Sequence, residues 1–251
     1  MVHFIGAGSG AADLITVRGA KLLSEADVII WAGSLVNPAL LEYAKSGCEF
    51  HNSAEMTLEE VLGVIEAAEA AGKTTVRLHT GDPCLYGAVR EQFDALAARG
   101  IDYDVCPGVS AFCGAAAALR AEYTLPGVSQ TVVITRAEGR TPVPEREQLR
   151  ALAAHRATMV LFLSASLAEE VQAELLAGGY PAETPAAVVS RATWPDERTW
   201  RCTVGTLAET MASNGVRKTA LILVGDFLGN DYERSRLYDP GFTTGCREAK
   251  P

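Results

Sequence analysis

The sequence predicts an α/β protein with two domains, because short apolar strands alternate with amphipathic helices along most of the chain. In the first part, each main strand runs into a glycine-bearing turn and then a helix, which is typical of a mainly parallel sheet. Further on, strands at 186–190 and 199–204 flank a Trp-Pro turn and predict an antiparallel pair. We therefore expect a first domain at 1–121 and a second domain with a mixed sheet at 122–251.

Composition excludes several classes of protein. The 251 residues are 48% hydrophobic and 21% charged, enough apolar material for a proper core. A net charge of −9 disfavours nucleic-acid binding. The longest apolar runs have the length of a strand, far below the roughly 20 residues of a membrane helix, so a soluble, untargeted, cytoplasmic protein is expected. The six cysteines form no Cys-x-x-Cys pair, which favours free thiols over a zinc site or disulfides.

The first domain begins with a strand at 2–5, a glycine turn at 6–10 and a helix that Thr16 can cap. The turn also matches a dinucleotide fingerprint, but the second strand, 26–31, lacks the acid at its end that would hold a ribose, so a nicotinamide cofactor is disfavoured. A short helix at 40–44 and a longer one, opened by the capping box at 57–60 and stopped by Gly72, follow.

The central strand, 75–79, runs into Thr80-Gly81-Asp82-Pro83. Gly81 lets the backbone approach a ligand, and Asp82 supplies a carboxylate that can bind the ligand, cap a helix beginning near Leu85, or do both. The helix itself is expected at 88–99, with Gly100 as its terminator. A strand at 103–106 then breaks at 107–110 into a helix of small residues at 111–119.

The second domain follows a turn-rich linker at 122–127. Strands are predicted at 131–135, 159–163 and 220–225, in addition to the antiparallel pair. Helices are predicted before 159, after 166 and near 207–211, and residues 230–251 are expected to form a loosely packed tail.

The order of the glycine-bearing breaks at 6–10, 32–34, 80–83 and 107–110 resembles the tetrapyrrole methylase family. The likeness extends to 135–137 and 185–190 in the second domain. The resemblance implies a two-domain enzyme that methylates ring carbons of corrinoid precursors with S-adenosylmethionine and releases S-adenosylhomocysteine. Ala32-Gly33-Ser34 and Trp194-Pro195 look most like the branch that methylates C11 of precorrin-4, and both metal-free and cobalt-containing substrates stay open.

The resemblance also implies a cofactor site, carried over position by position to Thr80, Gly81, Asp82, Leu85, Ser110, Ala111, Leu163, Ala192, Thr219 and Ala220. Leu163 stands where relatives often have Met. In the first loop Ser9 and Ala11 replace the usual Pro and Asp, so the role of that Asp is either dispensable here or taken by Asp13. An Asp suits the cofactor because its sulfonium and ammonium are cationic.

The reaction expected is an in-line attack by a nucleophilic ring carbon of the substrate on the sulfonium methyl group, so no catalytic triad or metal is expected and no catalytic residue is assigned. The acidic chain should need a basic rim to hold a polycarboxylate. Arg136 and Arg191 are the best candidates among Arg77, Arg120, Arg136, Arg140 and Arg191. His79, beside the central loop, is either a substrate contact or a polar residue at a strand end.

Other functions stay open. The same fold can methylate uroporphyrinogen III or another precorrin carbon, and further alternatives are an RNA or protein methyltransferase and a nucleotide-binding module without catalysis. The family resemblance also implies a homodimer. Leu35, Val36, Leu40 and Leu41 could supply part of its contact or belong to the core.

Overall fold

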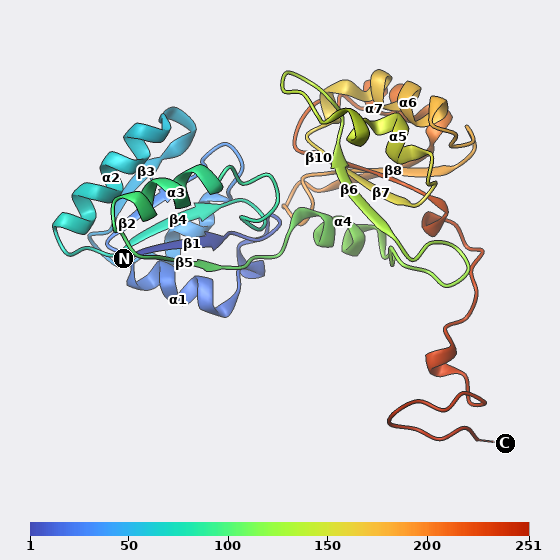
Figure 1. Ribbon diagram of the computed structural model, residues 1–251, viewed down its shortest axis with the longest axis horizontal. Helices are drawn as coiled ribbons and strands as arrows, with labels where there is room; N and C mark the ends of the chain where they lie inside the picture. The colour runs from blue at the N-terminus through green and yellow to red at the C-terminus, as the bar shows by residue number, and fades with distance from the viewer. Residues whose placement is uncertain (251) are drawn as a thin grey trace. The chain divides into compact units, whose positions relative to one another are not determined.

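The protein is described by a computed structural model that covers residues 1–250, and the chain divides into two compact units (Figure 1). Unit 1 comprises Met1–Ala115 together with Arg191–Glu197, and unit 2 comprises Ala116–Ser190 and the chain from Arg198 onward. The contact-based division thus falls after Ala115 and gives unit 1 a segment from much later in the sequence. The domain boundary after residue 121 stays a prediction.

Unit 1 contains a five-stranded sheet in the order β3-β2-β4-β1-β5, in which every pair of neighbours is parallel. This confirms the parallel sheet predicted for the first domain. The strands are β1 (Val2–Gly6), β2 (Val28–Trp31), β3 (Glu49–Asn52), β4 (Thr75–His79) and β5 (Tyr103–Cys106). The helices are α1 (Val17–Glu25), α2 (Leu58–Ala70) and α3 (Arg90–Ala98), and the division between the two units falls within α4 (Ala111–Leu119).

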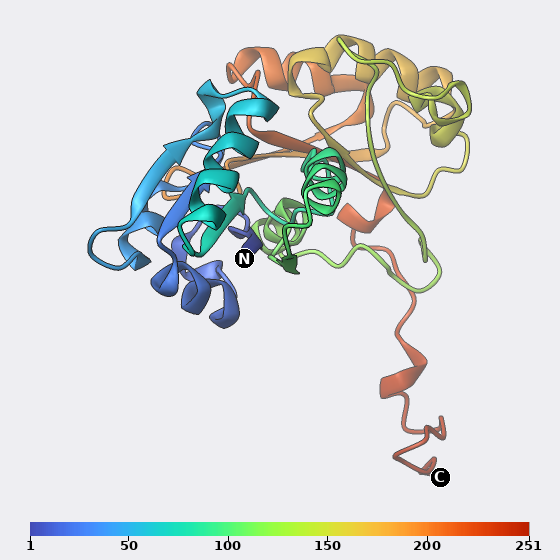
Figure 2. The same cartoon turned by 60° about the vertical axis from the view of Figure 1, so that its left-hand side comes forward.

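Helices cover both faces of this sheet, as Figure 2 shows. Leu23 of α1 packs with Ile5, Ile29 and Leu78 on one face, and the apolar side of α2 packs with Phe4 and Ile30 on the other. Val36 and Leu40 are only 2% and 1% exposed and belong to the first of these clusters. These two residues thus belong to the core, whereas Leu35, 41% exposed, and the half-buried Leu41 leave a dimer contact as a prediction.

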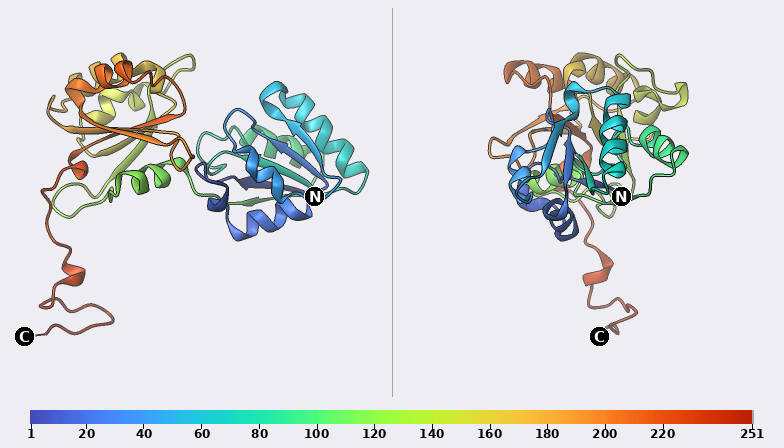
Figure 3. Two further views of the ribbon diagram at one scale, coloured as in Figure 1. Left: turned by 180° about the vertical axis from the view of Figure 1, so that it is seen from behind. Right: turned by 90° about the vertical axis from the view of Figure 1, so that its left-hand side faces the viewer.

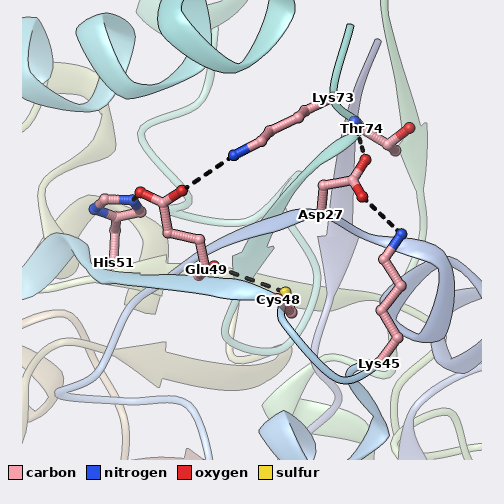
Figure 4. A network of polar contacts seen from close by, with 7 residues as sticks. All are labelled: Asp27, Lys45, Cys48, Glu49, His51, Lys73 and Thr74. Carbon is pink, nitrogen blue, oxygen red and sulfur yellow. Dashed lines mark hydrogen bonds and ion pairs between the residues drawn. The ribbon is translucent and has the colours of Figure 1, made fainter. Parts of the chain in front are cut away.

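Edge strand β3 had no clear signal in the sequence, because Phe50 is its single large apolar side chain and is itself exposed. Polar contacts hold this edge (Figure 4). Asp27 accepts hydrogen bonds from Lys45 at 2.7 Å and from the Thr74 amide at 2.9 Å. Glu49 pairs with His51 at 2.8 Å and with Lys73 at 3.5 Å. These cationic or donating partners lower the pKa of both carboxyl groups, the largest causes being the hydrogen bonds from Lys45 and His51, respectively.

Unit 2 contains a mixed five-stranded sheet in the order β6-β7-β10-β8-β9, which confirms the mixed sheet predicted for the second domain. Only β6 and β7 are parallel, and the β8–β9 pair is antiparallel as expected. The strands are β6 (Val132–Arg136), β7 (Thr158–Phe162), β8 (Pro185–Ser190), β9 (Arg198–Thr203) and β10 (Ala220–Val224). Figure 3 shows α5 (Leu149–Ala153), α6 (Ala168–Ala177) and α7 (Leu207–Ser213) grouped together on this sheet.

Candidate functional site

Three glycines bring the loops after β1, β4 and β5 into backbone contact at the carboxyl edge of the unit 1 sheet. A Cβ on Gly6 would lie 2.6 Å from the backbone of both Gly108 and Gly81. A Cβ on Gly108 would lie even closer to the Gly81 carbonyl oxygen. Gly8 and Gly81 also exchange two backbone hydrogen bonds, of 3.2 and 2.9 Å. Only glycine allows this approach, and it places the predicted cofactor loop beside the other two.

Asp82 fastens two of these loops together through its carboxylate. One oxygen accepts a hydrogen bond from the Cys84 amide and the other from the Gly108 amide, both at 2.8 Å. Burial alone would raise the pKa of this carboxyl group, but the hydrogen bonds outweigh it and the pKa is lowered. Helix α3 begins at Arg90, so the prediction that Asp82 caps a helix beginning near Leu85 is wrong. Its negative charge instead holds the loop after β5.

The structure brings together most of the cofactor residues predicted in the first domain. Gly81 has a φ of 60°, and a Cβ there would lie at an ordinary 3.5 Å from backbone atoms of Ser110 and Ala111 and 3.9 Å from Ser110 Oγ. Thr80 next to it is exposed, whereas Ser110 is only 7% exposed. Leu85 is half-buried in the same loop. Gly81 therefore presents bare backbone to the space beside the start of α4.

A fourth segment, Arg191–Glu197, is fastened to the first glycine loop by Thr193. Thr193 Oγ1 lies 3.0 Å from Ser9 Oγ and accepts a hydrogen bond of 3.0 Å from the Ala11 amide. The two positions at which this chain departs from the family pattern thus contact Thr193, whereas Asp13 is exposed in a short 3-10 turn. The role of Thr193 was not predicted from the sequence. Thr193 is more than 180 positions from Ser9 and Ala11 in the sequence, and no local pattern reveals a contact over that separation.

Thr193 and its neighbours adopt an unusual backbone. Thr193 has a φ of 65° and Arg191 a φ of 51°, a region that β-branched and bulky residues rarely occupy. The indole of Trp194 fills the space that a side chain at Gly10 would need. The predicted cofactor residue Ala192 lies buried between these two strained residues, at 6% exposure.

The remaining cofactor candidates lie in unit 2, at one edge of its sheet. Because β7 and β10 are antiparallel, Leu163 after the end of β7 and Thr219 before the start of β10 share that edge with Ala220. Leu163 and Thr219 both have a φ of 53°, and the Leu163 side chain is 64% exposed. Non-glycine residues in this conformation cost energy and gather at functional sites. An exposed, strained leucine has no packing role that would explain it.

The arginines singled out from the sequence have diverse surroundings. The prediction that Arg77 can belong to a basic rim is wrong. Arg77 is 7% exposed inside unit 1 and donates hydrogen bonds to the Gln92 side chain and to the Ile30 carbonyl. Burial lowers its pKa to about 10. Arg136 donates to the carbonyls of Ala137, Thr141 and Pro142 and thus shapes its own loop.

Arg191 and His79 also have partners or burial that the sequence did not reveal. The Arg191 guanidinium lies 4.1 Å from the Trp194 ring centroid and donates to Asp196 at 2.6 Å. His79 is 5% exposed and stacks on Phe4. Burial, followed by the charge of Arg77, lowers its pKa to about 3, so it is neutral. Its Nε2 is buried without a hydrogen-bond partner among residues 1–250. Substrate contact by either residue stays a prediction.

Two features are absent from residues 1–250. No group of three or more His, Cys, Asp or Glu side chains there has the geometry to hold a metal ion. Within the same residues, none of the helices combines the length and apolar character needed to cross a membrane.

Comparisons with known proteins agree with this geometry. Residues 1–208 match the profile of the family described as Tetrapyrrole (Corrin/Porphyrin) Methylases. The cobalt-precorrin-4 C(11)-methyltransferase of Methanocaldococcus jannaschii is 53% identical over 99% of this chain and 96% of its own length. The precorrin-4 C(11)-methyltransferase of Mycobacterium tuberculosis H37Rv is 48% identical over 94% of this chain and 95% of its own.

Solved structures give a similar result. The X-ray structure of cobalt precorrin-4 methyltransferase, a cobalamin biosynthetic enzyme, matches with a TM-score of 0.89 and 48% identity, over 91% of this chain and 96% of that one. A uroporphyrin-III C-methyltransferase from Thermus thermophilus, solved in complex with S-adenosyl homocysteine, matches with a TM-score of 0.77 and 27% identity, over 90% and 92% of the two chains.

Proposed function

We propose that this chain, which belongs to the tetrapyrrole (corrin/porphyrin) methylase family, transfers a methyl group from S-adenosylmethionine to C11 of precorrin-4 or cobalt-precorrin-4. The observation that carries the proposal is the 53% identity, over 99% of the chain, with a relative named for that reaction. Relatives named for precorrin-4 and for cobalt-precorrin-4 are both similar to it, so the metal content of the substrate is left to experiment.

The cofactor site proposed in unit 1 fits a cationic ligand. Gly81 has no side chain at the point where a Cβ would lie 3.5 Å from Ser110 and Ala111, and Asp82, with its lowered pKa, keeps a negative charge in the same loop at neutral pH. We assign Thr80, Gly81, Asp82, Leu85, Ser110, Ala111 and Ala192 to cofactor binding in this unit. From unit 2 we assign Leu163, Thr219 and Ala220, which is supported by the strained backbone at the first two.

When bound, S-adenosylmethionine supplies an electrophilic methyl group on a sulfonium. The ring carbon of the tetrapyrrole is the nucleophile, so this chain needs to supply orientation and a dry environment rather than a general base. Rigid placement is what the unit 1 loops offer, since backbone contacts among Gly6, Gly81 and Gly108 leave them little freedom. We propose that Asp82 acts mainly by fixing these loops and secondarily by its charge.

The substrate is expected to carry carboxylates, and Arg191 and Arg136 stay the proposed contacts, with His79 as a third. Arg191 is the better candidate, because its half-buried side chain pairs with Asp196 and an aromatic face, whereas Arg136 donates to three carbonyls. A guanidinium can bind a carboxylate in bidentate fashion, which Lys cannot do.

We further propose that the protein works in the cytoplasm as a homodimer. Its six cysteines are free, which fits a reducing compartment. The homodimer is implied by the family resemblance.

The proposal is tested by incubating the purified protein with methyl-labelled S-adenosylmethionine and, separately, with precorrin-4, cobalt-precorrin-4 and uroporphyrinogen III. We expect a mass gain of one methyl group with a precorrin-4 substrate and a labelled carbon at C11 by NMR. Methylation of uroporphyrinogen III alone would favour the alternative represented by the Bacillus subtilis uroporphyrinogen-III C-methyltransferase, which is 29% identical over 92% of this chain. Label at another ring carbon would refute the C11 assignment.

A further inference from the structure

A groove lies between edge strand β3 and helix α2 of unit 1. Its volume is about 700 Å³, and its apolar lining includes Phe50, which is 46% exposed, with Met56 and Val64. The outer edge of β3 has no neighbouring strand among residues 1–250. Gly63 of α2 lines the groove and has no atom within 4 Å of the position of an added Cβ. Apolar surface, open space and an unpaired edge thus coincide.

The charge around this β3–α2 groove is acidic. Of the three lining glutamates, Glu49 is paired with Lys73, as Figure 4 shows. Glu55 and Glu60 have no cationic partner among residues 1–250, since they accept hydrogen bonds only from the Asn52 amide group and the Thr57 backbone. The groove therefore carries two carboxylates in excess and suits a partner with an apolar side and two cations.

The C-terminal arm, defined as residues 231–250, carries four acidic and four basic side chains and so has no net charge, but Arg234 and Arg236 stand beside large apolar side chains in it. Near its start, Glu233 N donates a hydrogen bond to the Pro126 carbonyl, and the arm then extends beyond the sheet of unit 2 (Figures 1 and 2). Its large apolar side chains are unusually exposed, Tyr232 at 60%, Leu237 at 64% and Tyr238 at 74%.

The arm nevertheless has a defined shape. The Arg247 guanidinium donates to the carbonyls of Leu237, Asp239 and Phe242, at 2.6–3.3 Å, and Lys250 N donates to Pro240. A short segment without a core does not gain enough from such bonds to order itself in water, so a surface that covers its apolar side chains is expected.

We propose that the C-terminal arm docks into the β3–α2 groove of a second copy of this chain. Leu237 and Tyr238 fill the apolar lining, and Arg234 and Arg236 meet Glu55 and Glu60. Neither arginine has an acidic partner among residues 1–250. Reciprocal docking closes a symmetric dimer with two identical contacts. The inference rests on the proposed homodimer and not on the proposed reaction.

The test uses full-length chains and light scattering. The unmodified protein should be a dimer of 26.6 kDa subunits. The double variant Leu237→Ser/Tyr238→Ser removes the apolar side of the arm, and Gly63→Trp fills the groove at a position with open space. Each should raise the dimer dissociation constant at least tenfold, because central apolar anchors dominate such contacts. Matched controls are Val17→Ser, 89% exposed elsewhere on unit 1, and Ala70→Trp, exposed on α2 outside the groove.

Mixing the arm variant with the groove variant separates docking between copies from docking within one. Each mixed pair retains one intact arm and one intact groove, so heterodimers should form where neither variant self-associates. Exchanging charges by Glu55→Arg and Arg236→Glu should weaken association singly and restore it together.

An unmodified protein that is monomeric overturns the proposal together with the homodimer. A dimer unaffected by the arm and groove variants overturns the docking alone and leaves the homodimer to another surface. Methylation assays on the same variants report independently on the proposed reaction.

Discussion

Asp82→Ala tests how the loops of unit 1 are held. The substitution removes two hydrogen bonds of 2.8 Å and leaves the half-buried Gly108 amide without its acceptor. The bond to Gly108 is worth about 1.5–3 kcal/mol as a bond to a charged group, whereas water can replace the exposed one to Cys84 at little cost. We therefore expect a loss of about 2 kcal/mol in the free energy of unfolding, which corresponds to a fall of roughly 4–8 °C in melting temperature.

Binding should weaken with the same substitution, because the loop proposed to hold the cofactor loses both its anchor and its charge. We expect the dissociation constant for S-adenosylmethionine, measured by calorimetry, to rise about tenfold or more while the protein remains folded. Asp94→Ala is the control, since it removes only an exposed pair on α3. An unchanged dissociation constant would show that Asp82 is not part of the cofactor site, and an unchanged melting temperature would refute the anchoring.

The pH dependence of stability gives the same carboxylate a second test. The pKa of Asp82 is lowered in the folded state, so its contribution is present above the unfolded value of 3.8 and is lost as the pH falls through the lower folded value. Melting temperatures of the parent and of Asp82→Ala should therefore differ at neutral pH and converge toward strongly acidic pH. A constant difference down to pH 2 would contradict this account.

Gly108→Ala should unfold the loops or prevent soluble expression, because the new methyl group would collide with the Gly81 carbonyl oxygen. A circular dichroism melt like that of the parent would contradict the close approach of Gly108 and Gly81. Leu163→Gly should raise the free energy of unfolding by about 0.5 kcal/mol, because it relieves the strain of a leucine with positive φ but adds the conformational entropy that glycine loses on folding. The same substitution should weaken cofactor binding. Lower stability in a denaturant titration would argue against strain at this position. Asp27→Asn should lower stability at pH 7 but not at pH 2, since the carboxyl pKa is lowered in the folded state. Arg191→Ala should raise KM for the tetrapyrrole about tenfold, more at low salt than at high salt, and leave cofactor affinity unchanged. A KM equal to that of the parent protein would show that Arg191 is not part of the substrate site.

The parallel and mixed sheets could be predicted because their central strands are runs of buried apolar residues, a signal that lies within each segment. Edge strand β3 could not, because its order depends on Asp27, Lys45 and Lys73, which come from other parts of the chain. The start of α3 was placed too early for a related reason. Tyr86 and Ala88 adopt positive φ values of 55° and 48°, which are not helical, and their residue types do not predict this conformation.

The candidate site was predictable to the extent that it consists of backbone turns. Glycine marks such turns directly, and Gly6, Gly81 and Gly108 indeed meet. The roles of side chains were harder to predict, because they depend on which residues from other parts of the sequence the fold places next to them. Arg77 is buried against Gln92 although it lies beside the central loop, and Thr193 reaches Ser9 from a distant hairpin.

The contact among the three glycines restricts how this chain can vary. In an ordinary core, a larger side chain at one position can be offset by a smaller one at a neighbour, so pairs of substitutions survive where single ones fail. Opposite Gly6 and Gly108 there are only main-chain atoms, and no second substitution can make them smaller. In a saturation library selected for activity, both positions should stay glycine in every genetic background, whereas Gly63 and Gly245, with open space around them, should accept many residues.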